Sequence, residues 1–151
     1  MRALGLDLGS KRIGVALSTS DGSMATPYEV VERGRDHERD HQRIKELATD
    51  TGAELLVVGL PLSLDGTDGP AATAARAEAR ELEASTGLPV ELWDERLTTV
   101  TADRDLQALD LDAKARRRVV DQVAAAVMLQ AWLDHRRLAG KSFSAPEEQE
   151  R

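Results

Sequence analysis

The sequence contains no cysteine among its 151 residues. This absence excludes a disulfide framework, thiol catalysis and cysteine-ligated zinc, and it suits a reducing compartment. The amino-terminal segment also lacks a basic start followed by a long apolar run, because Asp7 and Lys11 interrupt it early. We therefore expect a cytoplasmic protein with no membrane association.

Basic residues are fewer than acidic ones, which gives a formal net charge of −7. This balance argues against a protein that coats nucleic acid through bulk charge. It remains compatible with a nuclease that has a local basic surface and an acidic metal centre. No internal repeat or low-complexity segment is present, and the length predicts one domain with a substantial core.

Hydrophobic patterning predicts an α/β chain that begins with an antiparallel meander. Residues 2–7 and 12–18 form two short strands, and the turn between them contains Gly9, which tolerates a positive φ. Residues 24–32 form a third strand, and Pro27 within it favours an edge position in the sheet.

The rest of the chain predicts two parallel strands with helices around them. Residues 54–60 are almost continuously apolar, which is typical of a strand buried on both faces of a sheet. A strand, a helix and a strand in that order form a βαβ unit with parallel strands. The remaining expected elements are a charged helix ending at Gly52, a helix from about 67 to 85, a strand at 88–93, and helices at 98–108 and 110–138. The polar tail, 139–151, is expected to be disordered, which leaves one domain at 1–138.

Three acidic positions stand out: Asp7 in the first strand, Asp94 and Glu95 directly after the last strand, and Asp121 inside the last helix. Asp7 lies between Leu6 and Leu8, where an unpaired carboxylate is costly. It could accept backbone hydrogen bonds from the following turn, or it could bind a metal ion. If the first and last strands run in the same direction, Asp7 and Glu95 share one edge of the sheet.

Asp121 falls on or beside the apolar stripe of its helix. The helix dipole does not explain it, since that effect fades beyond the first turn. An ion pair with Arg117 or Arg118 is one explanation. A second is that the small residues at 124–126 bring the helix close to the sheet and carry Asp121 towards Asp7.

A carboxylate cluster of this kind suits Mg²⁺ or Mn²⁺, which prefer oxygen ligands. Two such ions about 4 Å apart can activate a water and stabilise the leaving oxygen in phosphodiester cleavage. This chemistry needs no histidine, and we expect His37, His41 and His135 to be solvated.

The sequence resembles the YqgF/RuvX family of Holliday-junction resolvases, also described as pre-16S rRNA nucleases. The matching segments are LGLDLGSKRIGVALS at 4–18, VVGLPLSLDGT at 57–67, DERLTT at 94–99 and VDQVAAAVMLQAWL at 120–133. The resemblance implies an RNase H-like fold with a five-stranded mixed sheet flanked by helices. It also implies endonucleolytic cleavage of structured nucleic acid with Mg²⁺ or Mn²⁺, and it makes Asp7, Glu95 and Asp121 the catalytic metal-binding acids.

The resemblance has one departure from the wider superfamily. RNase H-like resolvases carry an acid on the fourth strand, whereas VVGLPL has none, so Glu95, with Asp94 as its near alternative, would substitute from the end of the fifth strand. Lys11, Arg12 and Arg96 are candidate phosphate contacts, and a solvated surface is their alternative.

Two other functions remain open on sequence alone. One is a non-catalytic nucleic-acid-binding or ribosome-assembly factor, which the missing acid and the net charge favour. The other is an ATP-binding module of the actin and sugar-kinase type, although those proteins use two such domains and this chain has room for one. A four-way junction substrate would favour a homodimer with two sites, whereas an rRNA end needs only one.

Overall fold

Five strands form one mixed sheet in the computed structural model, which describes residues 1–98 and 113–148. The strands are β1 (Ala3–Leu8), β2 (Arg12–Ser18), β3 (Ala25–Glu32), β4 (Leu55–Leu60) and β5 (Val90–Asp94). Their order is β3-β2-β1-β4-β5. The first three strands pair antiparallel, and β4 and β5 run parallel to β1. The predicted mixed sheet is confirmed, with β3 at an edge.

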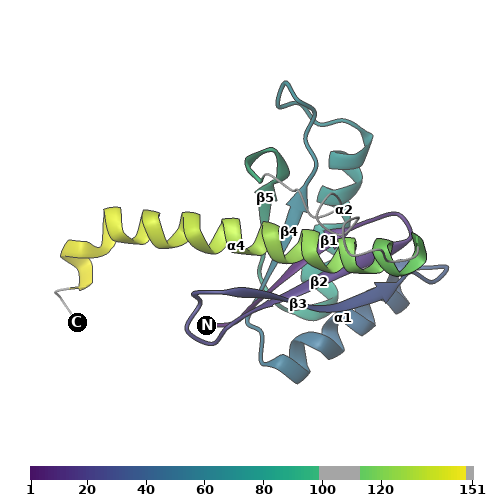
Figure 1. The fold of residues 1–151 in the computed structure, drawn as a ribbon, viewed down its shortest axis with the longest axis horizontal. Helices are drawn as coiled ribbons and strands as arrows, with labels where there is room; N and C mark the ends of the chain where they lie inside the picture. Colours follow the sequence, from purple (N-terminus) through teal and green to yellow (C-terminus); the bar gives the residue numbers. More distant parts are fainter. Residues whose placement is uncertain (99–112, 149–151) are drawn as a thin grey trace.

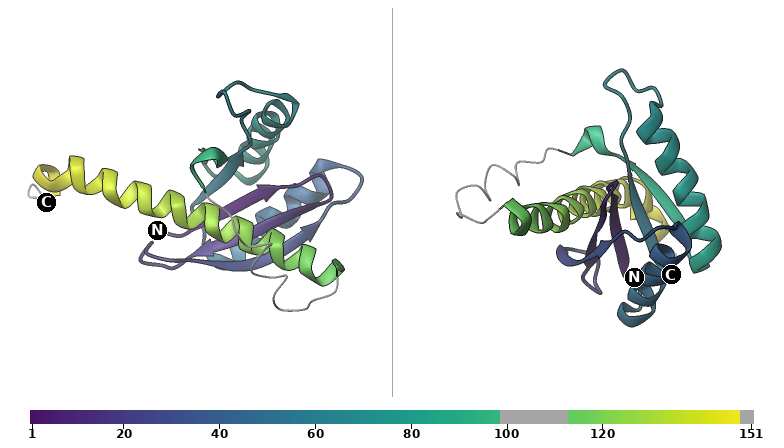
Figure 2. Two further views of the ribbon diagram at one scale, coloured as in Figure 1. Left: turned by 45° about the horizontal axis from the view of Figure 1, so that its top comes forward. Right: turned by 90° about the vertical axis from the view of Figure 1, so that its right-hand side faces the viewer.

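Helices cover both faces of this sheet. They are α1 (His37–Thr51), α2 (Pro70–Thr86) and α4 (Ala113–Glu148), with a short 3₁₀ turn, η1 (Glu95–Leu97), directly after β5. Figure 1 shows α4 crossing one face of the sheet, while α1 and α2 lie behind the opposite face. The right-hand view in Figure 2, which looks along α4, shows the same three layers edge-on.

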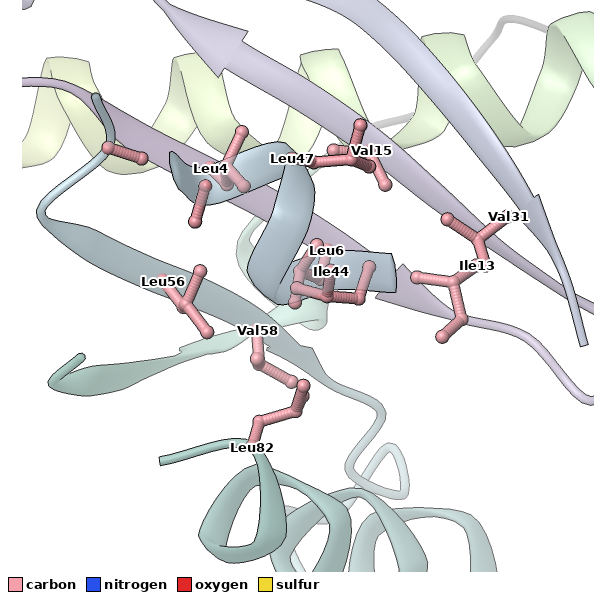
Figure 3. Close-up of a cluster of buried hydrophobic side chains, with 12 residues drawn as sticks. Leu4, Leu6, Ile13, Val15, Val31, Ile44, Leu47, Leu56, Val58 and Leu82 are labelled. Carbon is pink, nitrogen blue, oxygen red and sulfur yellow. The ribbon is translucent and has the colours of Figure 1, made fainter. Parts of the chain in front are cut away.

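The alternation of side chains along β1 produces two separate cores. Leu4 and Leu6 pack in a cluster with residues of α1 and α2, among them Ile44 and Leu82 (Figure 3). Ala3 belongs to the second cluster, which β1, β4 and α4 share. Asp7 has the same parity as Ala3, so its side chain lies on the face that α4 covers.

Glycines allow α4 to lie against the sheet backbone. A Cβ atom at Gly14 would overlap the carbonyl oxygen of Asp121, and one at Gly5 would lie 2.8 Å from Cβ of Leu129. On the helix side the contact is also made by small residues, since Ala125 and Ala126 are buried. The expectation that small residues bring this helix close to the sheet is confirmed.

Two segments expected from the sequence, the helix at 98–108 and the tail at 139–151, lie wholly or partly outside the described residues. The helix expected at 98–108 falls almost wholly in the undescribed segment. In the tail at 139–151, α4 continues to Glu148, and the disorder expected for this tail stays a prediction. Nothing before Pro146 stops the helix, since the single glycine there, Gly140, costs a helix only about 1 kcal/mol. None of the helices in the described ranges has the length and apolarity needed to cross a membrane.

We predict that Gly14→Ala lowers the free energy of unfolding by about 2–3 kcal/mol, because the added methyl meets helix backbone that cannot rotate away. Gly140→Ala is the matched control. A Cβ there meets nothing within 4 Å, and alanine favours a helix. Urea unfolding of the two variants measures the difference. Equal stability of Gly14→Ala and the wild-type protein would contradict the close contact.

Candidate active site

Asp7 lies between two glycines on the face of the sheet that α4 covers. In the antiparallel pairing of β1 with β2, Asp7 is opposite Gly14. In the parallel pairing with β4, Leu6 is opposite Val58, so Gly59 follows on the other side of Asp7. No side chain from either neighbouring strand therefore covers the Asp7 carboxylate.

Each glycine makes room for another acid. A Cβ atom at Gly59 would lie 2.5 Å from Oε2 of Glu95, so the Glu95 carboxylate occupies the space above β4. The backbone of Asp121 occupies the corresponding space above Gly14. A carboxylate thus reaches β4 from η1, although β4 itself has no acidic residue. The structure brings Asp7, Glu95 and Asp121 to one edge of the sheet.

A small cavity opens between these elements. Its volume is about 50 Å³, and its walls are formed by Asp7, Glu95, Thr98, Ala124 and Met128. That volume holds a small number of water-sized groups. The sequence analysis missed Thr98, although it belongs to the DERLTT segment. Its hydroxyl accepts a 2.8 Å hydrogen bond from the indole of Trp93.

The two acids in the cavity are costly to ionise. Burial, and then the charge of Asp121, raise the pKa of Asp7. Burial, together with the charges of Asp7 and Asp94, raises the pKa of Glu95 to about 7. The turn after β1 does not relieve Asp7, since the Gly9 N–H donates to the backbone carbonyls of Asp7 and Arg12. The alternative in which this turn satisfies the Asp7 carboxylate is therefore not observed at Gly9.

Asp121 has a partner from the opposite end of the sequence. Its Oδ2 accepts a 2.5 Å hydrogen bond from Nε of Arg12, which is 109 residues away. We expected Arg12 to contact phosphate, and here it neutralises an acid of the site. The side chains of Arg117 and Arg118, the other partners considered for Asp121, lie outside the description.

Asp94 and Glu95 have different environments despite their adjacency. Asp94 caps η1 by accepting from the Arg96 N–H, and it also pairs with the Arg96 guanidinium at 2.7 Å. Arg96 donates further to the carbonyl of Leu64 at 3.2 Å, which ties the loop before α2 to η1. Glu95, rather than Asp94, lines the cavity with Asp7.

A buried polar network that the sequence analysis missed supports the turn after Asp7. Arg33 donates to the carbonyl of Gly9 at 2.7 Å and to both carboxylate oxygens of Glu78 at 2.8 and 2.9 Å. His41 also contacts Glu78, with its Nε2 2.7 Å from Oε2. The expectation that His41 is solvated is wrong, because its ring is 2% exposed under α2. The helical pattern of α1 alone carries no signal for a charged partner on another helix.

Glu78 ionises readily despite being buried. Burial opposes its charged form, but the hydrogen bonds from His41 and Arg33 outweigh this and lower the pKa of Glu78 to about 2. The ionised Glu78 carboxylate therefore pairs through both of its oxygens with the positively charged Arg33 guanidinium.

His37, His41 and Glu78 form a group whose potential ligand atoms all lie within 4.8 Å of one another. The bidentate contact of Arg33 with Glu78 places a cation where a metal ion would compete, so we interpret this group as an ion-pair network. Asp7, Glu95 and Asp121 do not form such a close group within the described residues. Asp121 is instead paired with Arg12.

Comparison with known proteins gives one consistent result. A family model described as the Holliday junction resolvase RuvX matches residues 1–135. A relative from Moorella thermoacetica, named as a candidate pre-16S rRNA nuclease, is 51% identical over 89% of this chain and 95% of its own length. A relative from Pelotomaculum thermopropionicum with the same name is 44% identical over 98% of this chain and 99% of its own length.

The solved structures show the fold. RuvC of Thermus thermophilus in complex with a Holliday junction substrate matches 89% of this chain and 96% of its own, with a TM-score of 0.55 at 15% identity. A second T. thermophilus RuvC structure matches with a TM-score of 0.52. The expected RNase H-like fold is confirmed.

We predict that Glu78→Gln lowers the free energy of unfolding at pH 7 by about 3 kcal/mol, because it removes the bidentate partner of buried Arg33 and leaves that guanidinium only the more distant carboxylate of Asp40, at 3.6 Å. The wild-type contribution is present above the unfolded pKa of about 4.5 and is lost as the pH falls towards 2. The variant should therefore show a flatter stability profile across that window.

The matched control for this measurement is Glu81→Gln, one turn along the same helix. Glu81 pairs with His37 at the surface, where both side chains are about half exposed, so its removal should cost less than about 1 kcal/mol. Urea unfolding at several pH values compares the two variants. Similar losses in both would show that the buried network adds nothing beyond a surface pair.

Proposed function

The chain belongs to the RuvX family of Holliday junction resolvases, and we propose that it is a divalent-metal-dependent endonuclease acting on structured nucleic acid. One observation supports this most directly: Asp7 and Glu95 share a cavity and both have raised pKa values. Raised pKa values of neighbouring carboxyl groups in a cavity are typical of functional sites.

The donor set fits a divalent cation. Asp7, Glu95 and Asp121 offer carboxylate oxygens, which Mg²⁺ and Mn²⁺ prefer, and a cation would offset the cost of burying the first two. When bound, such a cation supplies activation of a water and stabilisation of the leaving oxygen in phosphodiester hydrolysis. We assign these three residues as its ligands and as the catalytic acids.

The surrounding residues orient the acids. Asp7 is fixed by its place on the central strand, and the Asp94 cap holds η1 and therefore Glu95. Arg12 keeps Asp121 neutralised in the absence of substrate. Arg12, which lies beside these acids, is also a candidate phosphate contact. Lys11 on the neighbouring turn is exposed and is a second phosphate contact. Arg96 is a third candidate, but it acts first by holding Asp94.

We propose two substrates, a four-way DNA junction and the 5′ end of precursor 16S rRNA. The first follows from the family description and the second from the names of the relatives. Cleavage of a junction at two symmetric positions would require a homodimer with two sites. Cleavage of an rRNA end would require one site alone.

We predict that the wild-type protein cuts a four-way junction or a precursor rRNA fragment with Mg²⁺ or Mn²⁺, and cuts a linear duplex much less. Asp7→Asn and Glu95→Gln should each lower the cleavage rate by about 100-fold or more, because each removes a ligand charge. Asp94→Asn is the matched control, since asparagine also caps a helix and this acid does not line the cavity.

Single-turnover cleavage of the three substrates measures these rates. Full activity in Asp7→Asn would overturn the assignment of the acids. Loss of activity in Asp94→Asn with retention in Glu95→Gln would exchange the roles of the two neighbours. Binding of the junction or the rRNA without cleavage at any metal concentration would favour a non-catalytic binding factor.

We also predict a pH dependence of the metal-free protein. The pKa of Glu95 is about 7 in the folded state and about 4.5 in the unfolded chain. Between these values only the native state keeps the proton, so the Glu95 contribution to stability decreases as the pH rises from 4.5 to 7. Added Mg²⁺ should therefore raise the melting temperature more at pH 8 than at pH 5.

Thermal unfolding with and without Mg²⁺ at the two pH values tests this prediction. Glu95→Gln cannot ionise, so it should show a smaller pH-dependent loss and a smaller response to Mg²⁺. A response to Mg²⁺ that is equal at both pH values, or equal in the variant, would contradict metal binding by Glu95.

A further inference from the structure

A second cavity lies near the carboxyl ends of β1 and β4, next to the acids but on the α1 and α2 side of the sheet. Its volume is about 360 Å³, within the range of small-molecule pockets, and Glu95 lines both this cavity and the smaller one beside Asp7. Its other walls come from the β1–β2 turn, the end of β4, the first half of α2 and the start of α1. A nucleic-acid strand whose phosphate lies at Asp7 therefore has this cavity next to it.

The cavity is lined by both apolar and polar residues. Leu8, Pro61, Ala71, Ala74 and Ala75 form apolar surface, and small alanines on α2 keep the space open. Ser10 and His37 supply polar groups, and both are exposed. A nucleobase has the matching character, because its two faces are apolar and its edges carry hydrogen-bonding groups.

Charge in the cavity favours a base over a phosphate. The Arg33 guanidinium on the cavity wall is bonded to both oxygens of Glu78, so this pair offers no net charge to an anion. Glu95 adds a carboxylate on the side nearest the acids. Because the Arg33–Glu78 pair supplies no free cation to hold a phosphate, the apolar lining of the cavity suits a neutral base better.

We propose that this second cavity receives one unpaired nucleobase of the substrate strand, adjacent to the phosphate at Asp7. The inference rests on the proposed nuclease function and adds the selection of unpaired nucleotides. A base held in a duplex would first have to unstack and unpair, at a cost of a few kcal/mol, whereas a base at a junction crossover or in single-stranded rRNA is already free.

Binding measurements with Ca²⁺ in place of Mg²⁺ test this inference separately from cleavage. The probes are a fluorescein-labelled four-way junction and a labelled single-stranded rRNA fragment, each with one abasic nucleotide placed at successive positions. In the wild-type protein, an abasic nucleotide at one position should weaken binding about tenfold, because base contacts of this kind are lost. Abasic nucleotides at other positions should have little effect.

Two variants fill the cavity. Ala74→Trp and Ala71→Trp place a large ring at exposed positions on α2 that line it, and both should weaken binding of the intact probe about tenfold. In both variants an abasic nucleotide at the sensitive position should no longer weaken binding, because the tryptophan already excludes the base from the cavity. Ala84→Trp, at an exposed position on the same helix outside the cavity, is the matched control. Circular dichroism of all three variants is the control for folding.

The outcomes separate this inference from the proposed function. A flat abasic profile in the wild-type protein, or an unchanged profile in both cavity variants, would overturn the base pocket even if cleavage is observed. A single sensitive position that is lost in the cavity variants supports the pocket even if no substrate is cut. Absence of binding to either probe overturns the inference.

Discussion

The absence of side chains on both sides of Asp7 is the constraint on which the candidate site depends. Gly14 on β2 and Gly59 on the β4 side leave the Asp7 carboxylate uncovered on the face of α4. The backbone of Asp121 occupies the space above the first glycine, and the carboxylate of Glu95 the space above the second. Any larger side chain at either position would displace one acid. The central strand therefore supplies one acid, and its neighbours supply the room for two more.

Two arginines balance the charge around this arrangement in different ways. Arg12 pairs directly with Asp121, where both side chains are partly exposed and the pair can exchange. Arg33 is held on Glu78 in a buried network and donates to Gly9, two residues beyond Asp7. Partly exposed ion pairs are weak and buried ones are costly to break. The Arg12 pair is therefore easier to separate than the Arg33 pair, which supports the turn that follows the central acid.

Local patterns predicted the sheet and pointed to the acids, because alternation, turn residues and strand ends are properties of neighbouring residues. The same reasoning could not find the partner of Asp121, since Arg12 lies 109 residues away in sequence. It also placed His41 in solvent, because its partner Glu78 comes from another helix. What sequence left open was mainly the pairing of charges between distant segments.

The last helix links the proposed chemistry to the stability of the fold. The contact of α4 with the sheet includes the backbone of Asp121 over Gly14 and the buried pair Ala125 and Leu129 near Gly5. Burial raises the pKa of Asp7, and the charge of Asp121, which this docking brings near, raises it further. Packing therefore favours the docked helix, and repulsion between carboxylates opposes it. Under the proposed function, a cation bound by the acids would remove this repulsion and strengthen the docking by mass action. A substitution in the contact between α4 and the sheet would then change cation affinity as well as stability.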